Sequence, residues 1–389
     1  MKVLVLTASY VPVLGGLQAV AHSLARYLIA RGHEVRVVTK RYPRSLASEE
    51  VIDLVPIQRW LFLKPSREVL RRKRPDLFAA SLYHAPATLI RLARVLATFQ
   101  PRTVNLHFPD SQIAPILCLR RFFSFRLVVS LHGHEVERHF GSDARSVVPD
   151  LCEDLKRVLR SADAVTACSR YLLGRAALIE PSVAAKGLVI HNGIDLEQLA
   201  GEGGYSHPRP YLLAYGRLTY TKGFDMLLFA FADIARRYND LDLIIAGDGE
   251  EATALSKLSD DLELRARVKF YGRASSADVG KLLRGCRAVV VPSRQETFGI
   301  VALEAIACGR PLVATRVGGL PELAEAAPGA SITFAEPEPA DLSRAVTHAL
   351  SIRPADPRDL DAFSLQRMVS AYERVLEPRR ETAHGNAQS

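Results

Sequence analysis

The strongest constraint on the fold is a repeated alternation of short apolar runs with longer segments of helical periodicity. At the start of the chain, an apolar run at residues 3–8 is followed by an amphipathic segment at 17–31 and a second apolar run at 35–39. Apolar runs of this length are typical of buried strands, and strands that alternate with helices form βαβ units around a parallel sheet. The chain is therefore predicted to be an α/β protein.

The alternation occurs twice, on either side of a segment of different composition. Residues 197–210 contain three glycines and two prolines without periodicity, which is typical of an interdomain linker. At 389 residues the chain is also too long for one ordinary hydrophobic core. We expect a first domain at 1–196 and a second at 205–360, each a doubly wound sheet.

The expected elements can be given by residue number. Further strands are expected at 103–106, 127–131, 164–167 and 188–190 in the first half, and at 211–215, 241–247, 268–272, 288–293 and 311–315 in the second. Helices are expected at 86–98, 224–237, 251–264, 276–285, 300–308 and 364–377. In open α/β sheets, ligands bind outside the carboxyl ends of the strands, so we expect the site there.

Charge narrows the classes of partner. The formal net charge of +9 favours an anionic partner such as a membrane surface, a nucleic acid or a phosphorylated substrate. The densest basic run comprises Arg67, Arg71, Arg72, Lys73 and Arg74. We interpret it either as a solvated helix face or as a peripheral contact with anionic lipid. It lacks the interleaved aromatic residues of a single-strand binding platform, so no nucleic acid partner is expected.

The cysteines and the apolar segments bear on location. Five cysteines occur without CxxC spacing, and we expect core residues or free thiols rather than a disulfide framework or a zinc cluster. The first residues are too short an apolar run for a signal peptide, and no run of about 18 apolar residues suggests a membrane span. We therefore expect a cytoplasmic protein, with peripheral contact at the inner face of the membrane as the alternative.

The most informative stretch is residues 289–322, where a strand, a polar loop and a helix follow one another. The free N–H groups at the helix start, around residues 298–301, form a natural anion site that suits a diphosphate. Glu296 lies in the loop and Glu304 lies in the helix. Their carboxylates only accept hydrogen bonds, which suits the hydroxyls of a sugar or a ribose. A purely structural role for Glu304 remains an equal alternative.

A second strand, loop and helix occur at residues 215–225. Arg217 and Lys222 lie in this loop, towards the positive end of the following helix dipole. An arginine binds phosphate through two parallel hydrogen bonds, whereas a lysine supplies a compact charge. Surface charge is the alternative interpretation for both, but their position favours phosphate binding.

Two further candidates lie in the first half of the chain. Gly15 and Gly16 open the first helix and permit close approach of a phosphate or sugar, although the full GxGxxG fingerprint of dinucleotide-binding proteins is absent. His132 directly follows the run at 127–131, where an imidazole could donate a hydrogen bond to substrate. His134 is its competitor for that role.

These motifs resemble the retaining glycosyltransferases of family 4, and the resemblance covers nearly the whole chain. The matching motifs are GG at 15–16, GHEV at 32–35, HGHE at 132–135, HNGID at 191–195, GRLTYTKG at 216–223, AGDGE at 246–250 and the pair of glutamates at 296 and 304. The resemblance implies the GT-B fold, in which two Rossmann-like domains face each other across a cleft. It also implies that the helix at 364–377 packs back on the first domain.

The resemblance assigns roles to the candidate residues. Arg217 and Lys222 would clamp the diphosphate of the donor, Glu296 would hold hydroxyls of the transferred sugar, and Glu304 would hold the ribose. His132 matches a position near the transferred sugar. The remaining donor-binding residues would be Gly15, Gly16, Gly216, Phe298, Gly299, Ile300 and Val301, the last four through backbone amides.

The implied activity is a hexosyltransferase type of glycosyl transfer from a nucleotide diphosphate sugar to a glycan, a lipid or a small molecule. No metal or other cofactor is expected, because the two DxD patterns, at 240–242 and 359–361, are attributed to chance. Residues 40–100 contain no motif that identifies the acceptor. Two alternatives stay open: a GT-B-like epimerase or phosphorylase, and a binding protein that keeps the nucleotide-sugar pocket without transferase activity.

Overall fold

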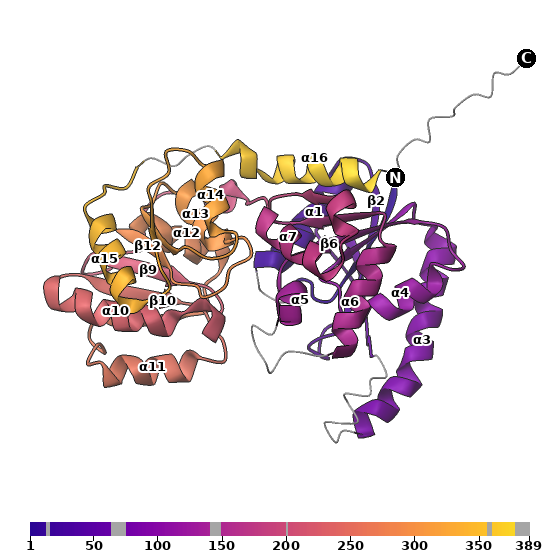
Figure 1. Cartoon of the computed structure of the whole chain (residues 1–389), viewed down its shortest axis with the longest axis horizontal. Helices are drawn as coiled ribbons and strands as arrows, with labels where there is room; N and C mark the ends of the chain where they lie inside the picture. The colour runs from indigo at the N-terminus through magenta and orange to yellow at the C-terminus, as the bar shows by residue number, and fades with distance from the viewer. Residues whose placement is uncertain (13–15, 64–74, 141–148, 200, 356–359, 378–389) are drawn as a thin grey trace, which may run out of the picture. The chain divides into compact units, whose positions relative to one another are not determined.

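The computed structural model describes residues 1–12, 16–63, 75–140, 149–199, 201–355 and 360–377 (Figure 1). The chain divides into two compact units. The first comprises residues 1–167 and 173–190 and continues from residue 368 onward. The second comprises residues 168–172 and 191–367. Each unit is built on its own largely parallel sheet, which confirms the predicted α/β class.

The first unit has an eight-stranded sheet in the order β3-β4-β2-β1-β5-β6-β7-β8. The strands are β1 (Lys2–Thr7), β2 (Glu34–Lys40), β3 (Glu49–Ile52), β4 (Val55–Trp60), β5 (Thr103–His107), β6 (Arg126–Leu131), β7 (Ala164–Ala167) and β8 (Gly187–Val189). Only β3 is antiparallel to its neighbour. The chain moves from β1 to β2 on one side and later places β5 on the other side of β1. The topological switch point, where ligands of such sheets bind, therefore lies between β1 and β5.

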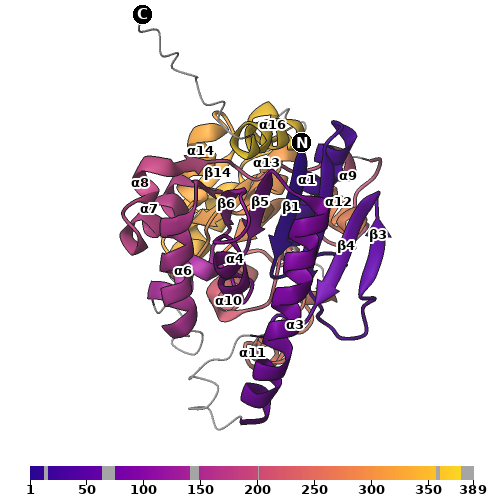
Figure 2. The ribbon, with the colours of Figure 1, turned by 90° about the vertical axis from the view of Figure 1, so that its right-hand side faces the viewer.

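The helices of the first half of the chain connect these strands. They are α1 (Gly16–Ala30), α3 (Pro75–Phe99), α4 (Ile113–Leu119), α5 (His134–Glu137), α6 (Pro149–Ser161), α7 (Arg170–Ile179) and α8 (Val183–Lys186). The helix expected at 86–98 is the second half of α3, which begins eleven residues earlier and contains Pro86. Figure 2 shows α3 running alongside β4 and β3.

The C-terminal helix α16 (Leu365–Leu376) bonds to the first unit through its last turns. Thr103 Oγ1 donates to the carbonyl oxygen of Leu376 at 2.6 Å, and Arg126 Nε donates to that of Val375 at 3.0 Å. The carboxylate of Glu373 pairs with Arg31 at 2.8 Å. These contacts attach the end of the described chain to the amino edge of the first sheet.

The second unit has a six-stranded parallel sheet in the order β11-β10-β9-β12-β13-β14. The strands are β9 (Tyr211–Tyr215), β10 (Asp242–Ala246), β11 (Val268–Gly272), β12 (Ala288–Val291), β13 (Leu312–Thr315) and β14 (Ile332–Ala335). The chain runs from β9 to β10 on one side and places β12 on the other. The switch point of this sheet therefore lies between β9 and β12. The loops that contain Arg217, Lys222 and Glu296 follow the carboxyl ends of these two strands.

The described helices of the second unit include the four expected at 224–237, 251–264, 276–285 and 300–308, and three others that were not predicted. They are α9 (Leu196–Leu199), α10 (Phe224–Arg237), α11 (Ala252–Asp261), α12 (Ser276–Gly285), α13 (Ile300–Ala307), α14 (Leu320–Ala326) and α15 (Pro339–Leu350). The start of α12 illustrates how local sequence fixes the first residue of a helix. Ser275 Oγ accepts the Asp278 N–H at 3.2 Å while the Asp278 carboxylate accepts the Ser275 N–H at 3.0 Å, which is a capping box.

The segment at 197–210 differs from a free linker. The Tyr205 N–H donates to the carbonyl oxygen of Lys281 at 2.8 Å, and Arg284 donates to the carbonyl oxygens of Leu199 and Gly203. These bonds hold the segment against α12. A glycine-rich segment without periodicity can pack through its backbone, and composition does not reveal such contacts.

The state of the cysteines agrees with the prediction of core residues or free thiols. All five cysteines are free thiols, and Cys168, Cys286 and Cys308 are buried. Among the described helices, none combines the length and the apolar character that crossing a bilayer requires.

Candidate active site

Two of the predicted site residues form an ion pair at the carboxyl edge of the second sheet. Lys222 ends a short 3-10 turn in the loop after β9, and Glu296 lies in the loop after the neighbouring strand β12. The Nζ atom of Lys222 lies 2.6 Å from Oε2 of Glu296. The side chain of Glu296 is 13% exposed and that of Lys222 is 32% exposed. The pair is therefore partly desolvated yet reachable from solvent.

Two glycines let the loops around this pair approach closely. Gly223 has a φ of 67°, and a Cβ atom there would lie 2.0 Å from the carbonyl oxygen of Pro292. Gly318 has a φ of 56°, and a Cβ atom there would lie 1.7 Å from the carbonyl oxygen of Glu296. Only glycine fits both the conformation and the space at these positions. The loops carrying Lys222 and Glu296 are consequently held against their neighbours through backbone contacts.

Arg294 joins the same two loops, and the sequence analysis did not single it out. Its guanidinium pairs with both carboxylate oxygens of Asp225 at 2.7 Å, lies 4.1 Å above the ring of Tyr220, and donates to the Tyr220 carbonyl oxygen at 2.9 Å. The backbone N–H of Arg294 also donates to the carbonyl oxygen of Thr221 at 2.8 Å. The sequence did contain two signals: Arg294 follows an expected strand, and Asp225 lies at the start of an expected helix. Because the two residues are 69 positions apart, their pairing could not be predicted from the sequence.

Arg217 also follows β9 and is exposed. Within the part of the chain that the structure describes, it forms no ion pair. Gly216 precedes it with a φ of 144°, and its N–H donates to the carbonyl oxygen of Ala246 at 3.0 Å. Arg217 therefore projects from a backbone-bonded turn as an uncompensated positive charge, next to the switch point of the sheet.

The predicted helix start is present. Gly299 is the N-cap of α13 with a φ of 96°, and Ile300 and Val301 form its first turn. The Phe298 side chain is 3% exposed and packs against the rings of His191 and Phe363 at centroid distances of 5.8 and 6.2 Å. Phe298 thus anchors the loop, and only its backbone is available to a ligand.

Glu304 has a partner that the sequence did not reveal. Tyr215, the last residue of β9, donates its hydroxyl to Oε2 of Glu304 at 2.5 Å. Burial raises the pKa of Glu304 to about 7, and the hydrogen bond from Tyr215 opposes part of that shift. Burial and the Glu304 charge also raise the pKa of Tyr215 well above its ordinary value, so the phenol stays protonated as the donor.

In the first unit, His132 is buried rather than exposed. Its ring stacks on Phe108 at 4.4 Å, and its Nε2 atom lies 2.9 Å from Nδ1 of His107. Burial together with His107 lowers the pKa of His132 well below its ordinary value, and burial lowers that of His107 to about 3. Both imidazoles are therefore neutral at physiological pH. The competitor His134 is exposed at the start of α5.

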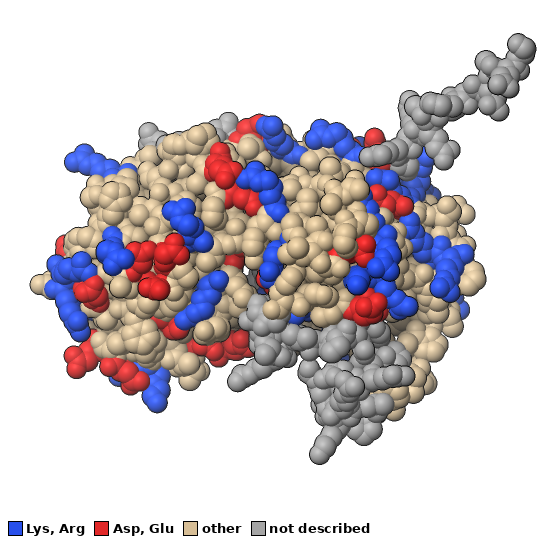
Figure 3. All heavy atoms as spheres, viewed as in Figure 1, with Lys and Arg blue, Asp and Glu red and all other residues tan. Residues whose placement is uncertain are grey.

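The glycine pair is described in part. Gly16 is the first residue of α1, whereas Gly15 lies outside the described residues. The basic run at 67–74 lies outside them as well. On the face drawn in Figure 3, Lys and Arg side chains are interspersed with Asp and Glu.

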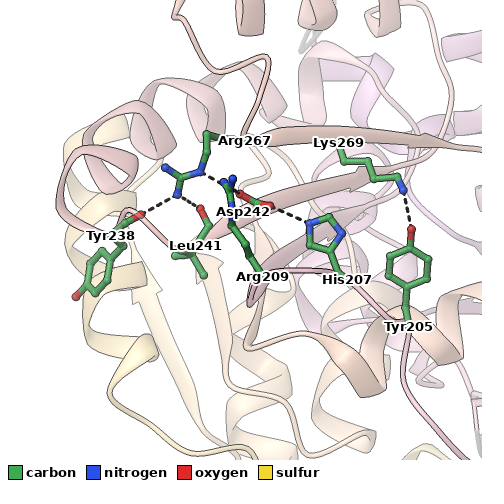
Figure 4. Close-up of polar contacts among 8 residues, drawn as sticks. All are labelled: Tyr205, His207, Arg209, Tyr238, Leu241, Asp242, Arg267 and Lys269. Atoms are coloured by element: carbon green, nitrogen blue, oxygen red, sulfur yellow. Dashed lines mark hydrogen bonds and ion pairs between the residues drawn. The ribbon is translucent and has the colours of Figure 1, made fainter.

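Asp242, from the first DxD pattern, is held by basic side chains at the amino end of β10. Its carboxylate pairs with His207 at 2.9 Å, Arg209 at 3.1 Å and Arg267 at 3.0 Å (Figure 4). This end of the strand is opposite to the edge that carries Lys222. Across the described ranges, no three His, Cys, Asp or Glu side chains are grouped as metal ligands. Asp359 of the second pattern lies outside the described residues, and the expectation of a metal-free enzyme stays a prediction.

Comparison with known proteins identifies the family. The family model described as Glycosyltransferase Family 4 matches residues 14–198, and that described as Glycosyl transferases group 1 matches residues 197–362. An uncharacterized glycosyltransferase of Methanocaldococcus jannaschii is 30% identical over 338 residues, which cover 83% of this chain and 82% of the relative. The glycogen synthase of Mycobacterium tuberculosis is 28% identical over 341 residues, covering 83% and 80%.

A solved structure shows the same fold. Anabaena HepE in complex with UDP and glucose superimposes with a TM-score of 0.72 at 19% identity, over 97% of this chain and 99% of that one. The family models together span nearly the whole chain, and the full-length relatives are enzymes that transfer glycosyl groups. The chain therefore belongs to glycosyltransferase family 4 and is a glycosyltransferase of the GT-B fold.

Proposed function

We propose that this glycosyltransferase takes its sugar from a nucleoside diphosphate sugar and retains the configuration at the anomeric carbon. The observation that carries the proposal is the Lys222–Glu296 pair, at 2.6 Å, next to the unpaired charge of Arg217 and the start of α13. Two cations and a helix N-terminus at one sheet switch point suit a diphosphate. The Anabaena relative, whose structure contains UDP and glucose, binds a ligand of this class.

The proposed chemistry is stabilisation of the leaving group. Cleavage of the bond between the anomeric carbon and the diphosphate leaves negative charge on the phosphate oxygens and positive charge on the sugar ring. Lys222 and Arg217 supply fixed positive charge where the negative charge develops, which lowers the barrier without a proton transfer from the protein. The acceptor oxygen then attacks the same face of the sugar, and the leaving phosphate takes the acceptor's proton.

The two carboxylates have separate proposed tasks. Glu296, held by Lys222, accepts hydrogen bonds from hydroxyls of the transferred sugar. Glu304, held by Tyr215 deeper in the unit, accepts hydrogen bonds from the ribose hydroxyls. Both roles use the acceptor-only character of an ionised carboxylate. His132 is neutral and buried against His107. Its proposed role is therefore to form a hydrogen bond, either with the substrate or with His107, and not to supply a positive charge.

The donor can be identified by a thermal-shift screen of UDP-, GDP- and ADP-sugars, because a ligand that binds the folded state raises the Tm. The preferred donor is then incubated with glycan, lipid and small-molecule acceptors, and NMR of the product reports the anomeric configuration. Transfer with retention supports the proposal. A donor that stabilises the protein and is never consumed identifies a binding protein, and inversion at the anomeric carbon contradicts the proposed mechanism.

Two further parts of the proposal concern cofactor and location. The reaction is proposed to require no metal, so EDTA should leave turnover unchanged. The enzyme is proposed to act in the cytoplasm, with residues 67–74 contacting anionic lipid at the membrane. Co-sedimentation with phosphatidylglycerol vesicles tests that contact, and a variant with the five basic residues of the run changed to glutamine should lose it.

A further inference from the structure

The first unit contains a cavity that the donor chemistry does not use. It has a volume of about 410 Å³ and lies between α3 and the strands β2, β3 and β4. Figure 2 shows α3 beside β4 and β3, the elements that carry most of the lining residues. Its lining includes Arg36 of β2, Arg91 and Arg94 of α3, and Trp60 of β4. The volume suits a small organic molecule, since ligand pockets commonly measure about 300–1,000 Å³.

The cavity is separate from the switch point of the first sheet, where ligands of such sheets bind. In the strand order of the first unit, β2, β4 and β3 lie on one side of β1, and the switch point lies on its other side, next to β5. Neighbouring strands are about 4.8 Å apart, so β4 and β3, the outer strands of the cavity, are roughly 12–17 Å from that point. Arg36 also lies near the amino end of β2. A ligand in the cavity would not occupy the switch point of the first sheet, and the residues proposed to bind the donor diphosphate all belong to the second unit.

The three arginines carry charge that the protein does not neutralise. Among the described residues, no carboxylate forms an ion pair with Arg36, Arg91 or Arg94. The guanidinium of Arg36 lies 4.6 Å above the buried ring of Phe99, which holds it in place without an acid. Glu50, an acid of the adjacent strand β3, pairs with the buried Arg59 and is occupied there.

The lining also offers groups that recognise hydroxyls. Gln58 faces Glu49 across the β3–β4 pair, and its Nε2 donates to Glu49 Oε1 at 3.1 Å. The hydroxyls of Ser48 and Thr98 complete the polar wall, and the largely buried Trp60 adds apolar surface to the lining. Three guanidinium groups against the one carboxylate of Glu49 leave a net charge of +2. A phosphate monoester carries about −1.5 to −2 at neutral pH, which matches that charge.

From these contacts we infer that the cavity is a second binding site, for a phosphate ester of a sugar or a cyclic polyol. Arg91 and Arg94 are three residues apart on α3 and present their guanidinium groups from one face of the helix, while Arg36 faces the cavity from the sheet. The phosphate binds these arginines, and the hydroxyls of the ring bind Gln58 and Glu49. The ligand is either a free metabolite or the headgroup of an inositol phospholipid.

Isothermal titration calorimetry of the full chain at physiological ionic strength tests this site. It measures the Kd of glucose 6-phosphate, glucose and inorganic phosphate. Glucose 6-phosphate is expected to bind about tenfold or more tightly than inorganic phosphate, because the ring adds hydrogen bonds, and glucose alone is expected not to bind measurably. Equal affinity for glucose 6-phosphate and inorganic phosphate overturns the recognition of the ring. Absence of binding both by every free phosphate probe and by vesicles containing phosphatidylinositol overturns the site.

Substitutions of the cavity arginines test whether glucose 6-phosphate binds in this cavity. The double variant Arg91→Gln and Arg94→Gln should weaken glucose 6-phosphate binding by about tenfold or more, and Arg36→Gln, from a different element, should weaken it independently. Arg121→Gln is the matched control, because Arg121 is an exposed arginine of the first unit outside the cavity. Unchanged far-UV circular dichroism verifies folding. Wild-type affinity in the double variant contradicts the proposal.

Lys222→Ala separates this site from the proposed donor site. It should leave glucose 6-phosphate binding unchanged while lowering kcat for sugar transfer by about 10²–10³-fold. Loss of glucose 6-phosphate binding in this variant would place the ligand at the diphosphate position instead. Titration with myo-inositol 1-phosphate, in parallel with flotation on vesicles containing phosphatidylinositol, distinguishes the two sources. Vesicle binding that the arginine substitutions abolish, without binding of the free esters, identifies the lipid headgroup.

Discussion

Lys222 and Glu296 are 74 positions apart in the chain, yet their side chains meet at 2.6 Å between the carboxyl ends of two adjacent strands. The contact exists because β9 and β12 pair directly, although three helices and two strands separate them along the chain. Glu296 compensates the charge of Lys222 before a ligand arrives. A diphosphate must therefore compete with Glu296 for the ammonium group, which couples donor binding to the position of Glu296.

Removal of either proposed phosphate-binding cation should impair transfer. Arg217→Ala and Lys222→Ala are each expected to lower kcat by about 10²–10³-fold, the range measured when one preorganised donor to a developing anion is lost. Initial rates at saturating donor measure the effect. Arg265→Ala and Lys257→Ala are matched controls, because both residues are exposed in the same unit and neither follows the carboxyl end of a strand: Lys257 lies in α11 and Arg265 precedes β11. Near-normal turnover in both test variants contradicts the leaving-group mechanism.

Neutralising Glu296 should separate binding from catalysis. Glu296→Gln frees Lys222 from its ion pair, so a nucleoside diphosphate is expected to bind more tightly than to the wild type. Transfer is expected to fall, because the amide accepts hydrogen bonds from the sugar hydroxyls less strongly than a carboxylate. Calorimetry with the nucleoside diphosphate and kcat/KM for the sugar donor measure the two effects. A parallel loss of both quantities would show that Glu296 holds the loop rather than the sugar.

Donor affinity should depend on pH through Glu304. The pKa of this carboxyl is raised to about 7, so lowering the pH through 7 protonates it and replaces an acceptor by a donor facing the ribose hydroxyls. Affinity for a nucleoside diphosphate sugar should therefore fall below pH 7, by up to about tenfold per pH unit. Titrations between pH 5.5 and 8.5, roughly one and a half units either side of this pKa, measure the dependence.

Two variants test the assignment to Glu304. Glu304→Gln should make the affinity independent of pH over this range. Tyr215→Phe removes the hydrogen bond that lowers the pKa, so the midpoint of the dependence should move to higher pH. A pH dependence that persists in Glu304→Gln assigns the titration to another group.

The Arg294–Asp225 pair should stabilise the loop that carries Lys222. Arg294→Lys keeps the charge but loses the two parallel hydrogen bonds and the contact with Tyr220, and it is expected to reduce the free energy of unfolding by about 1–3 kcal/mol. Arg344→Lys is the control. Its partner Asp341 lies three residues away on an exposed helix face, where such pairs contribute about 0.5 kcal/mol or less. Urea denaturation measures both, and equal effects contradict the proposed role.

The elements that the sequence predicted best are those with a continuous apolar run or a clear amphipathic period. The limits of β9, α10 and α12 agree with the predicted residues, because continuous apolar runs and amphipathic periods reflect burial that local composition already records. The strands β3, β4 and β14 were not predicted. β3 and β14 lie at the edges of their sheets, and β3 and β4 contain glutamate, proline, glutamine and arginine, so no apolar run marks them.

The α/β class, the two sets of strands and the loops that carry Arg217, Lys222 and Glu296 could be predicted from the sequence, because these properties follow from local periodicity and from the order of elements along the chain. The partners of the site residues could be read only from the folded chain: Glu296 for Lys222, Tyr215 for Glu304 and His107 for His132. A partner far away in the chain is chosen by strand pairing and by the desolvation of each side chain. Both depend on the whole sheet rather than on the residues nearby in sequence.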